Sequence, residues 1–284
     1  MMKLLLLSLA FSAFSTFAQV ESVSKIYSFT AKEMISYEDF AEETSSQSHF
    51  VLGEYHSSPA IQKAQSEFIE KTVTLFEKAN DFSVGWEFLE YADQIHSEQV
   101  FSKIDELDAN TFFTELLSPK NIDYYMPYHP ILLVTKKLGG ELIALNEKRE
   151  IKRIIVKEGM DKLPSQYLPP NYKIGSKAYL ERFKKAMGNH TPDEMIMPYF
   201  EAQCFTDSVM AYQFIKNATR TLRYTVVGSF HSDYKDGYVR ELKRISNEQP
   251  IITLKFVKRS DYDEKSWNDL ISDGAISDYL IIAP

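Results

Sequence analysis

The chain carries six short apolar runs with β-branched or aromatic residues, and all but the last of them end at a glycine or a polar residue. Runs of this kind are typical of buried strands. They are Phe50–Leu52, Phe82–Trp86, Leu142–Leu145, Tyr224–Val227, Ile251–Leu254 and Tyr279–Ile282. The pattern predicts a sheet that is buried on both faces.

The segments between these runs have apolar residues at helical spacing. Residues 60–79 place Ile61, Ala64 and Phe68 on one face, and residues 127–138 and 193–218 are amphipathic in the same way. Because strands that alternate with helices form βαβ units, we expect an α/β fold with a mainly parallel sheet. Three layers are expected, with helices on either side of the sheet.

Two segments lack strand patterns, about 91–128 and 158–195. Both combine several prolines with many aromatic residues. We interpret them as helical insertions that form a smaller subdomain within a single domain over residues 19–284, because no Gly/Ser-rich linker marks a boundary.

Polar residues follow four of the predicted strands. Ligands of parallel sheets bind beyond the carboxyl ends of the strands, where several chain reversals meet. The residues at these ends are Gly53-Glu54-Tyr55-His56, Glu87, Asn146 and Gly228-Ser229-Phe230-His231. Taken singly, each His is more often an ordinary loop residue. Together, Glu54, His56, Glu87 and His231 predict a site, because buried charges are costly unless they pair or bind something.

Two further groups lie outside the strand ends. Gln203 and Asp207 are one helical turn apart and would orient a His from behind, although a solvated helix face explains them equally well. Tyr125, Tyr128 and His129 belong to a dense aromatic segment. By default, this segment packs in the core. Alternatively, it forms the rim of a site for a flat ligand, and a Tyr or His of the segment is the axial ligand of haem iron.

Charge and the first residues limit the class of protein. The net charge is −8 with no basic run, which disfavours nucleic acid as a partner. Residues 1–18 combine Lys3, an apolar stretch and Thr16-Phe17-Ala18, the pattern of a signal peptide. No later run is long enough for a transmembrane anchor. The single cysteine, Cys204, lies far from the apolar stretch, so no cysteine directly after that stretch can carry a lipid. We therefore expect a periplasmic or secreted protein that is not a lipoprotein.

The ordered set of motifs resembles the ChaN-like family of haem-binding proteins, within the wider group of TIKI/TraB and erythromycin-esterase-like proteins. The matching residues are Gly53 to Pro59, Gly85-Trp86-Glu87, Asn146 to Arg149, Gln203 through Asp207 to Met210-Ala211, Gly228 to His231 and Asp236-Gly237. This chain departs from the family pattern at Ser57, where an acidic residue is usual, and at Ser229-Phe230, where Asn-Gly is usual.

The resemblance implies a three-layer α/β fold and the handling of haem or iron in the bacterial envelope, with iron uptake as the expected role. The expected partners are haem or another small molecule, an outer-membrane uptake receptor and a second copy of the chain in a homodimer. The related hydrolases carry catalysis at the positions of Glu54, His56, Glu87 and His231, and the metalloprotease-like branch suggests a divalent metal on Glu54, His56 and His231.

Three functions stay open at this point. The first is a haem-binding protein that uses Tyr125, Tyr128 or His129. The second is an envelope hydrolase in which Glu54 or Glu87 activates water, so whether the chain is an enzyme is left undecided. The third is a structural envelope protein.

Overall fold

The computed structural model describes residues 24–188, 191–246 and 250–284. The predicted signal peptide lies outside the described residues. Within the described part of the chain, no helix is both long enough and apolar enough to cross a membrane.

Eight strands form one sheet in the order β2-β1-β8-β7-β3-β6-β4-β5. The strands are β1 (Lys25–Ser28), β2 (Glu33–Ile35), β3 (His49–Glu54), β4 (Phe82–Glu90), β5 (Glu141–Asn146), β6 (Leu222–Gly228), β7 (Ile251–Lys258) and β8 (Tyr279–Ala283). The six strands from β8 to β5 in this order run parallel, while β1 is antiparallel to both β8 and β2. The predicted α/β class with a mainly parallel sheet is confirmed, and all six predicted strands are present.

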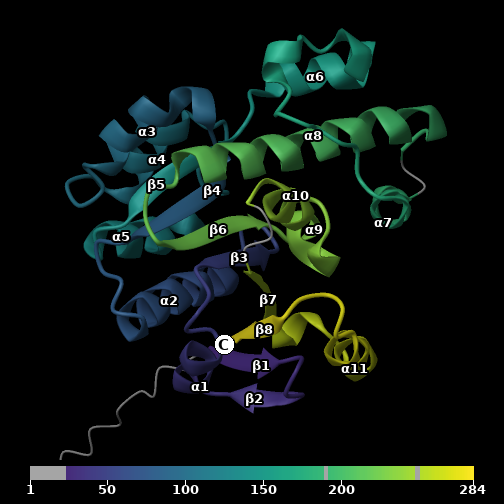
Figure 1. Cartoon of the computed structure of the whole chain (residues 1–284). Helices are drawn as coiled ribbons and strands as arrows, with labels where there is room; N and C mark the ends of the chain where they lie inside the picture. Colours follow the sequence, from purple (N-terminus) through teal and green to yellow (C-terminus); the bar gives the residue numbers. More distant parts are fainter. Residues whose placement is uncertain (1–23, 189–190, 247–249) are drawn as a thin grey trace, which may run out of the picture.

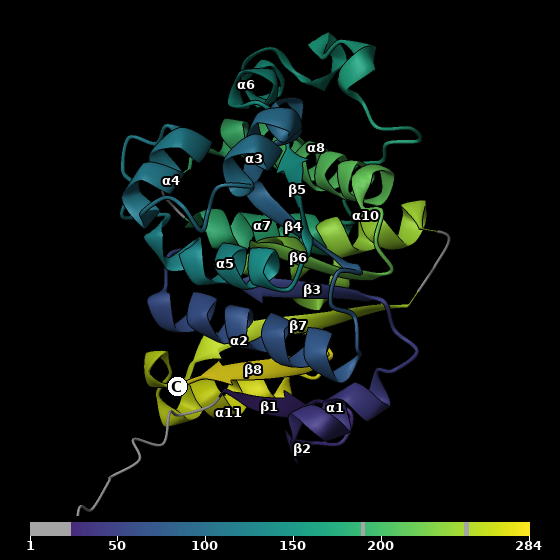
Figure 2. The same ribbon diagram turned by 90° about the vertical axis from the view of Figure 1, so that its left-hand side faces the viewer.

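Helices cover both faces of this sheet. They are α1 (Tyr37–Glu43), α2 (Pro59–Leu75), α3 (Gln94–Phe101), α4 (Ala109–Leu117), α5 (His129–Lys137), α6 (Arg149–Glu158), α7 (Lys177–Met187), α8 (Asp193–Asn217), α9 (Ser229–Ser232), α10 (Tyr238–Ile245) and α11 (Glu264–Ser272). Figure 1 shows α2 and α5 on one side of the sheet and α8 and α10 on the other. Figure 2, turned by 90°, shows α2 and α5 in front of the row of strands.

The alternation of side chains along β3 explains the two layers of core. Phe50 and Leu52 pack into the cluster that includes Phe68 of α2, whereas Val51 packs into the cluster that includes Phe214 of α8. All of these side chains are fully buried. Successive residues of a strand point to opposite faces, so a continuous apolar run is what a sheet covered on both sides requires.

The two segments predicted as insertions carry helices in their described parts. Residues 91–128 contain α3 and α4, and residues 158–195 contain α7 and the start of α8. In Figure 1, α7 lies beyond the sheet, beside the far end of α8 and near α9. This helix reaches the polar strand ends from the second insertion, and Tyr128 at the end of the first insertion reaches Glu54.

Candidate functional site

Glu54, Gly228 and Glu87 reach the same rim of the sheet. The parallel register pairs Glu54 of β3 with Gly228 of β6, and it pairs Trp86 of β4 with Val226 of β6, so that Glu87 follows one residue later. The predicted convergence therefore arises from the order β3-β6-β4. His56 and His231 lie just beyond the ends of β3 and β6.

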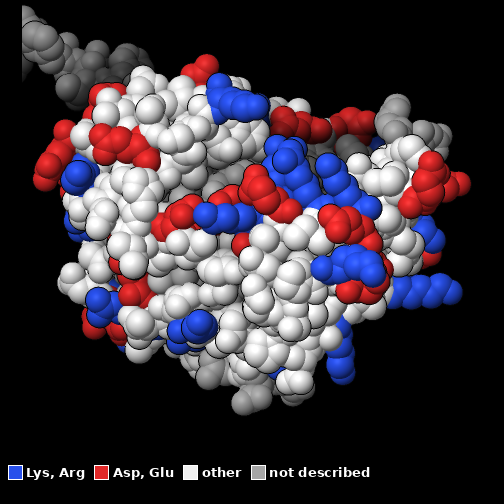
Figure 3. All heavy atoms as spheres, turned by 90° about the horizontal axis from the view of Figure 1, so that it is seen from above, with Lys and Arg blue, Asp and Glu red and all other residues white. Residues whose placement is uncertain are grey.

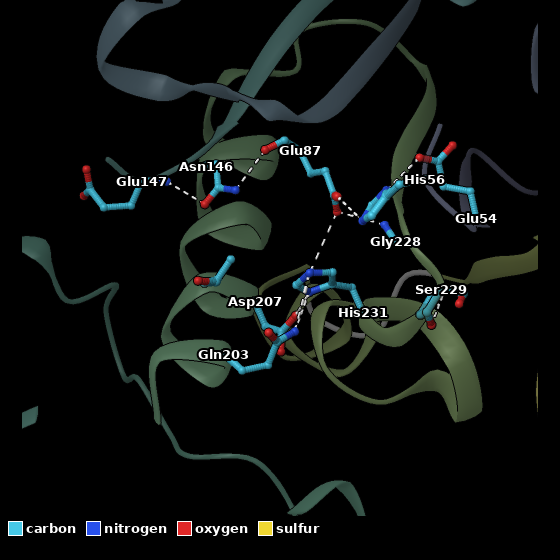
Figure 4. A network of polar contacts seen from close by, with 12 residues as sticks. Glu54, His56, Glu87, Asn146, Glu147, Gln203, Asp207, Gly228, Ser229 and His231 are labelled. Carbon is cyan, nitrogen blue, oxygen red and sulfur yellow. Dashed lines mark hydrogen bonds and ion pairs between the residues drawn. The ribbon is translucent and has the colours of Figure 1, made fainter. Parts of the chain in front are cut away.

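Glu87 bridges the two imidazoles, as Figure 4 shows. Its Oε1 lies 3.1 Å from Nε2 of His56, and its Oε2 lies 3.8 Å from Nε2 of His231. The backbone N–H of Gly228 donates to the same Oε2 at 2.8 Å. The carboxylate is almost fully buried.

Each imidazole has a second carboxylate at its other nitrogen. Nδ1 of His56 lies 3.0 Å from Oε1 of Glu54, and Nδ1 of His231 lies 2.5 Å from Oδ1 of Asp207. The result is a continuous polar chain of five side chains, Glu54–His56–Glu87–His231–Asp207. All four ring nitrogens face carboxylate oxygens.

Phenol and amide groups donate hydrogen bonds to the carboxylates at the two ends of this polar chain. Tyr128 donates to Glu54 at 2.5 Å, and Gln62 of α2 donates to its other oxygen at 2.7 Å. At the other end, Tyr179 of α7 donates to Asp207 at 2.8 Å. Burial of these carboxylates is tolerable because nearly every oxygen has a donor.

The electrostatics of the chain favour bound protons. Burial raises the pKa of Glu54 and of Asp207 above their ordinary values, against the opposing effect of their hydrogen bonds. Burial lowers the pKa of His56 and of His231, but the flanking carboxylates outweigh it and the net shift of both imidazoles is upward.

The predicted supporting residues occupy two distinct places. Gln203 and Asp207 share one face of α8, and the Gln203 amide lies 3.1 Å from Nδ1 of His231. Asn146 donates instead to the backbone carbonyl of Glu87 at 2.9 Å and receives the Lys152 ammonium at 3.0 Å. Asn146 therefore fixes the end of β4 and does not contact an imidazole.

The predicted haem-contacting residues lie away from the open side of the site. Tyr128 is 1 % exposed, and its hydroxyl is held by Glu54. The ring of His129 packs against Phe112 and Phe113, and Tyr125 packs against Phe88. Their role as haem contacts stays a prediction, and their packing away from the open side of the site does not support it.

Sequence reasoning missed the wall of the site. A pocket of about 500 Å³ opens between the strand ends and α7. Its lining includes Phe183, Ala186 and Met187 of α7, Phe230 of α9, and Tyr55, His56 and His231. A detectable signal was present, since Tyr179, Phe183 and Met187 recur every four residues and so form one stripe on a helix.

The two glycines that precede the site are needed for space. A glycine after a strand often allows a sharp turn of the backbone, but Gly228 has φ −55° and ψ 143°, which any residue adopts. A Cβ on Gly228 would lie 2.8 Å from Nε2 of His56, and one on Gly53 would meet the Ser232 hydroxyl. The glycines let the imidazole and α9 approach the sheet.

No arrangement for a metal ion is found among the described residues: no three His, Cys, Asp or Glu side chains are grouped to hold one. The predicted set of Glu54, His56 and His231 does not form such a group in the described structure.

The sequence of this chain matches the model of a known protein family over most of its length. The family model described as "Haem-binding uptake, Tiki superfamily, ChaN" matches residues 40–242, which include every member of the polar chain. The protein belongs to this family. The resemblance predicted from the motifs is thereby confirmed.

A solved structure of a ChaN protein supports the fold. A structure described as cofacial heme binding to ChaN of Campylobacter jejuni covers 93 % of this chain and 98 % of its own, with a TM-score of 0.71 and 19 % identity, a level that establishes the fold alone. The type III effector HopBA1 covers 87 % of this chain and 93 % of its own at 10 % identity and a TM-score of 0.49, too distant for any inference. A search of curated proteins gave no match.

Proposed function

We propose that this ChaN-family protein binds haem in the pocket between α7 and the strand ends, and that it does so after export, in iron uptake. The observation that carries the proposal is the pocket itself, which joins an apolar wall to a polar floor within the matched family region. Its volume of about 500 Å³ lies within the usual range of cofactor sites.

The residues present suit an amphipathic, planar ligand. Phe183, Ala186 and Met187 offer an apolar surface to a macrocycle. The exposed Lys184 and Lys185 lie on the same helix. Haem carries two carboxylates beside its apolar ring, so a helix that presents both kinds of side chain matches its two halves. When bound, haem would supply iron for transport.

The polar chain would act as the floor of this pocket. Its imidazoles and carboxylates satisfy one another, so they present a fixed polar surface and exclude a layer of mobile water. The hydrolase interpretation receives less support, because the family model describes haem-binding uptake.

The face seen from above carries acidic and basic side chains side by side (Figure 3). A surface with mixed charges offers no broad field of one sign to steer a polyanion. A small ligand that enters one pocket is the partner that this surface suits.

A titration of the purified protein with haem tests the proposal. We expect a Soret band that saturates at a fixed ratio of haem to chain; the ratio also shows whether this protein takes one haem or a stacked pair, as in the Campylobacter jejuni structure described as cofacial. Elemental analysis of the same sample reports any metal carried from expression. An unchanged spectrum at micromolar haem, with a folded protein, contradicts the proposal.

A further inference from the structure

Phe230 joins the end of β6 to the apolar wall of the pocket. Its ring stacks on that of Tyr179, with 5.3 Å between the centroids and 28° between the planes, and it meets Phe183 edge-on at 5.8 Å and 64°. Both partners belong to α7. Aromatic pairs in these arrangements attract each other beyond the area that they bury. Phe230 is nevertheless only half-buried and lines the pocket, so part of its ring stays open to a ligand.

A closed set of contacts holds Phe230 in this place. Tyr179 stacks on the Phe230 ring and donates its hydroxyl to Asp207. Asp207 in turn contacts His231, the residue that follows Phe230 in the chain. Two neighbouring residues of α9 are therefore fixed by the same tyrosine, one directly and one through a carboxylate. A binding surface that is ordered before the ligand arrives loses little conformational entropy on binding.

Several polar groups that line the pocket already have partners within the protein. Both nitrogens of His56 face carboxylate oxygens, at 3.0 and 3.1 Å. Asp233 receives the ammonium of Lys255 at 2.7 and 2.9 Å. The lining also includes apolar side chains, which are Phe183, Ala186, Met187 and Phe230. Contact with such side chains depends on the shape and the apolar area of the ligand, and not on a metal at its centre.

We propose that Phe230 is the residue on which a planar ligand stacks, and that the pocket therefore accepts metal-free tetrapyrroles as well as haem. This inference rests on the proposed function and goes beyond it, because it names the stacking residue and widens the class of ligand. The two faces of a tetrapyrrole are flat and apolar whether or not the ring holds iron. Stacking on an aromatic side chain needs only such a face.

Titration of the protein with metal-free protoporphyrin, followed by porphyrin fluorescence, tests the proposal. We expect the wild type to bind it saturably and haem to displace it, since both ligands occupy one pocket. Phe230→Leu keeps an apolar side chain but removes the aromatic face, so it should bind protoporphyrin about tenfold more weakly. Phe230→Tyr keeps the ring and should bind as the wild type does. Circular dichroism checks the fold, and Phe230→Met replaces Phe230→Leu if that variant does not fold.

Phe88 provides the matched control. It is half-buried like Phe230 and its ring lies 5.0 Å from that of His56, but it is outside the described lining of the pocket. Phe88→Leu should keep the affinity for protoporphyrin.

Three results would overturn the inference while leaving the proposed function in place. They are a wild type that binds haem but not metal-free protoporphyrin, a bound porphyrin that haem does not displace, and a Phe230→Leu variant that binds protoporphyrin as tightly as Phe88→Leu does. A wild type that binds neither ligand removes the proposed function and this inference together.

Discussion

Gly228 lies where the ring of His56 passes over the end of β6. The closest atom of that ring, Nε2, is the one that faces Glu87 at 3.1 Å. A side chain at this position would therefore meet the ring before it met anything else. The contact between His56 and Glu87 depends on the absence of a Cβ.

Gly228→Ala should displace His56 and lower the free energy of unfolding by about 1–3 kcal/mol, the usual cost of crowding a packed site. Urea unfolding measures this change. Gly274→Ala is the matched control, since nothing lies within 4 Å of a Cβ there and it should change stability by less than about 0.5 kcal/mol. Equal effects of the two substitutions would show that the imidazole does not need this space.

Single residues also show the limit of sequence reasoning about the site. Glu54, Glu87 and His231 were predictable because each comes within four residues of the end of an apolar run in the sequence. The sequence singled out Tyr128 as a candidate haem contact, but its hydrogen bond to Glu54 was not predictable, because it joins positions 74 residues apart. An aromatic segment does not reveal from sequence which of its rings turns a hydroxyl inward.

At the scale of elements, long buried strands were predictable and short edge elements were not. β3 to β8 carry continuous apolar runs, because helices cover both faces of the sheet there. β1 and β2 have only four and three residues, with exposed positions among them, so they leave little pattern. The other edge, β5, is protected by the Gln94 side chain of α3, which bonds the backbone of Leu142 and Ala144.

Helix α7 forms the apolar wall of the pocket, which no strand pattern could predict. Its apolar stripe was visible in the sequence. The sequence did not show that this stripe faces the strand ends, because a long connection brings the helix there. Tyr179 fixes it there, through a bond to Asp207 of α8 at 2.8 Å. Gly237 contributes as well: its φ of 53° and its close approach to that phenol both exclude a side chain.

At the scale of the whole molecule, the buried polar chain couples stability to pH. Both His56 and His231 have pKa values raised from 6.5 in the folded state, so folding binds their protons more tightly. Their contribution is complete below pH 6.5 and is lost as the pH rises through the folded pKa values. His49 has the opposite sign, since burial lowers its pKa to about 3; it is neutral in both states above pH 6.5.

We therefore expect the free energy of unfolding to fall as the pH rises from 6.5 through the raised folded-state pKa values of the two imidazoles. The variant His56→Gln/His231→Gln should flatten this dependence, and His96→Gln, at an exposed position, should not. Urea unfolding across this pH range measures it. A slope that persists in the double variant would place its origin elsewhere in the molecule.

The central claim is that haem enters the pocket bounded by α7, and the dissociation constant of haem for two variants of that helix tests it most directly. Ala186 lines the pocket, whereas the exposed Ala178 lies at the start of the same helix, outside the lining. Ala186→Trp should fill the pocket and weaken haem binding by about tenfold or more, while Ala178→Trp should match the wild type. Haem bound equally well by Ala186→Trp would contradict the account.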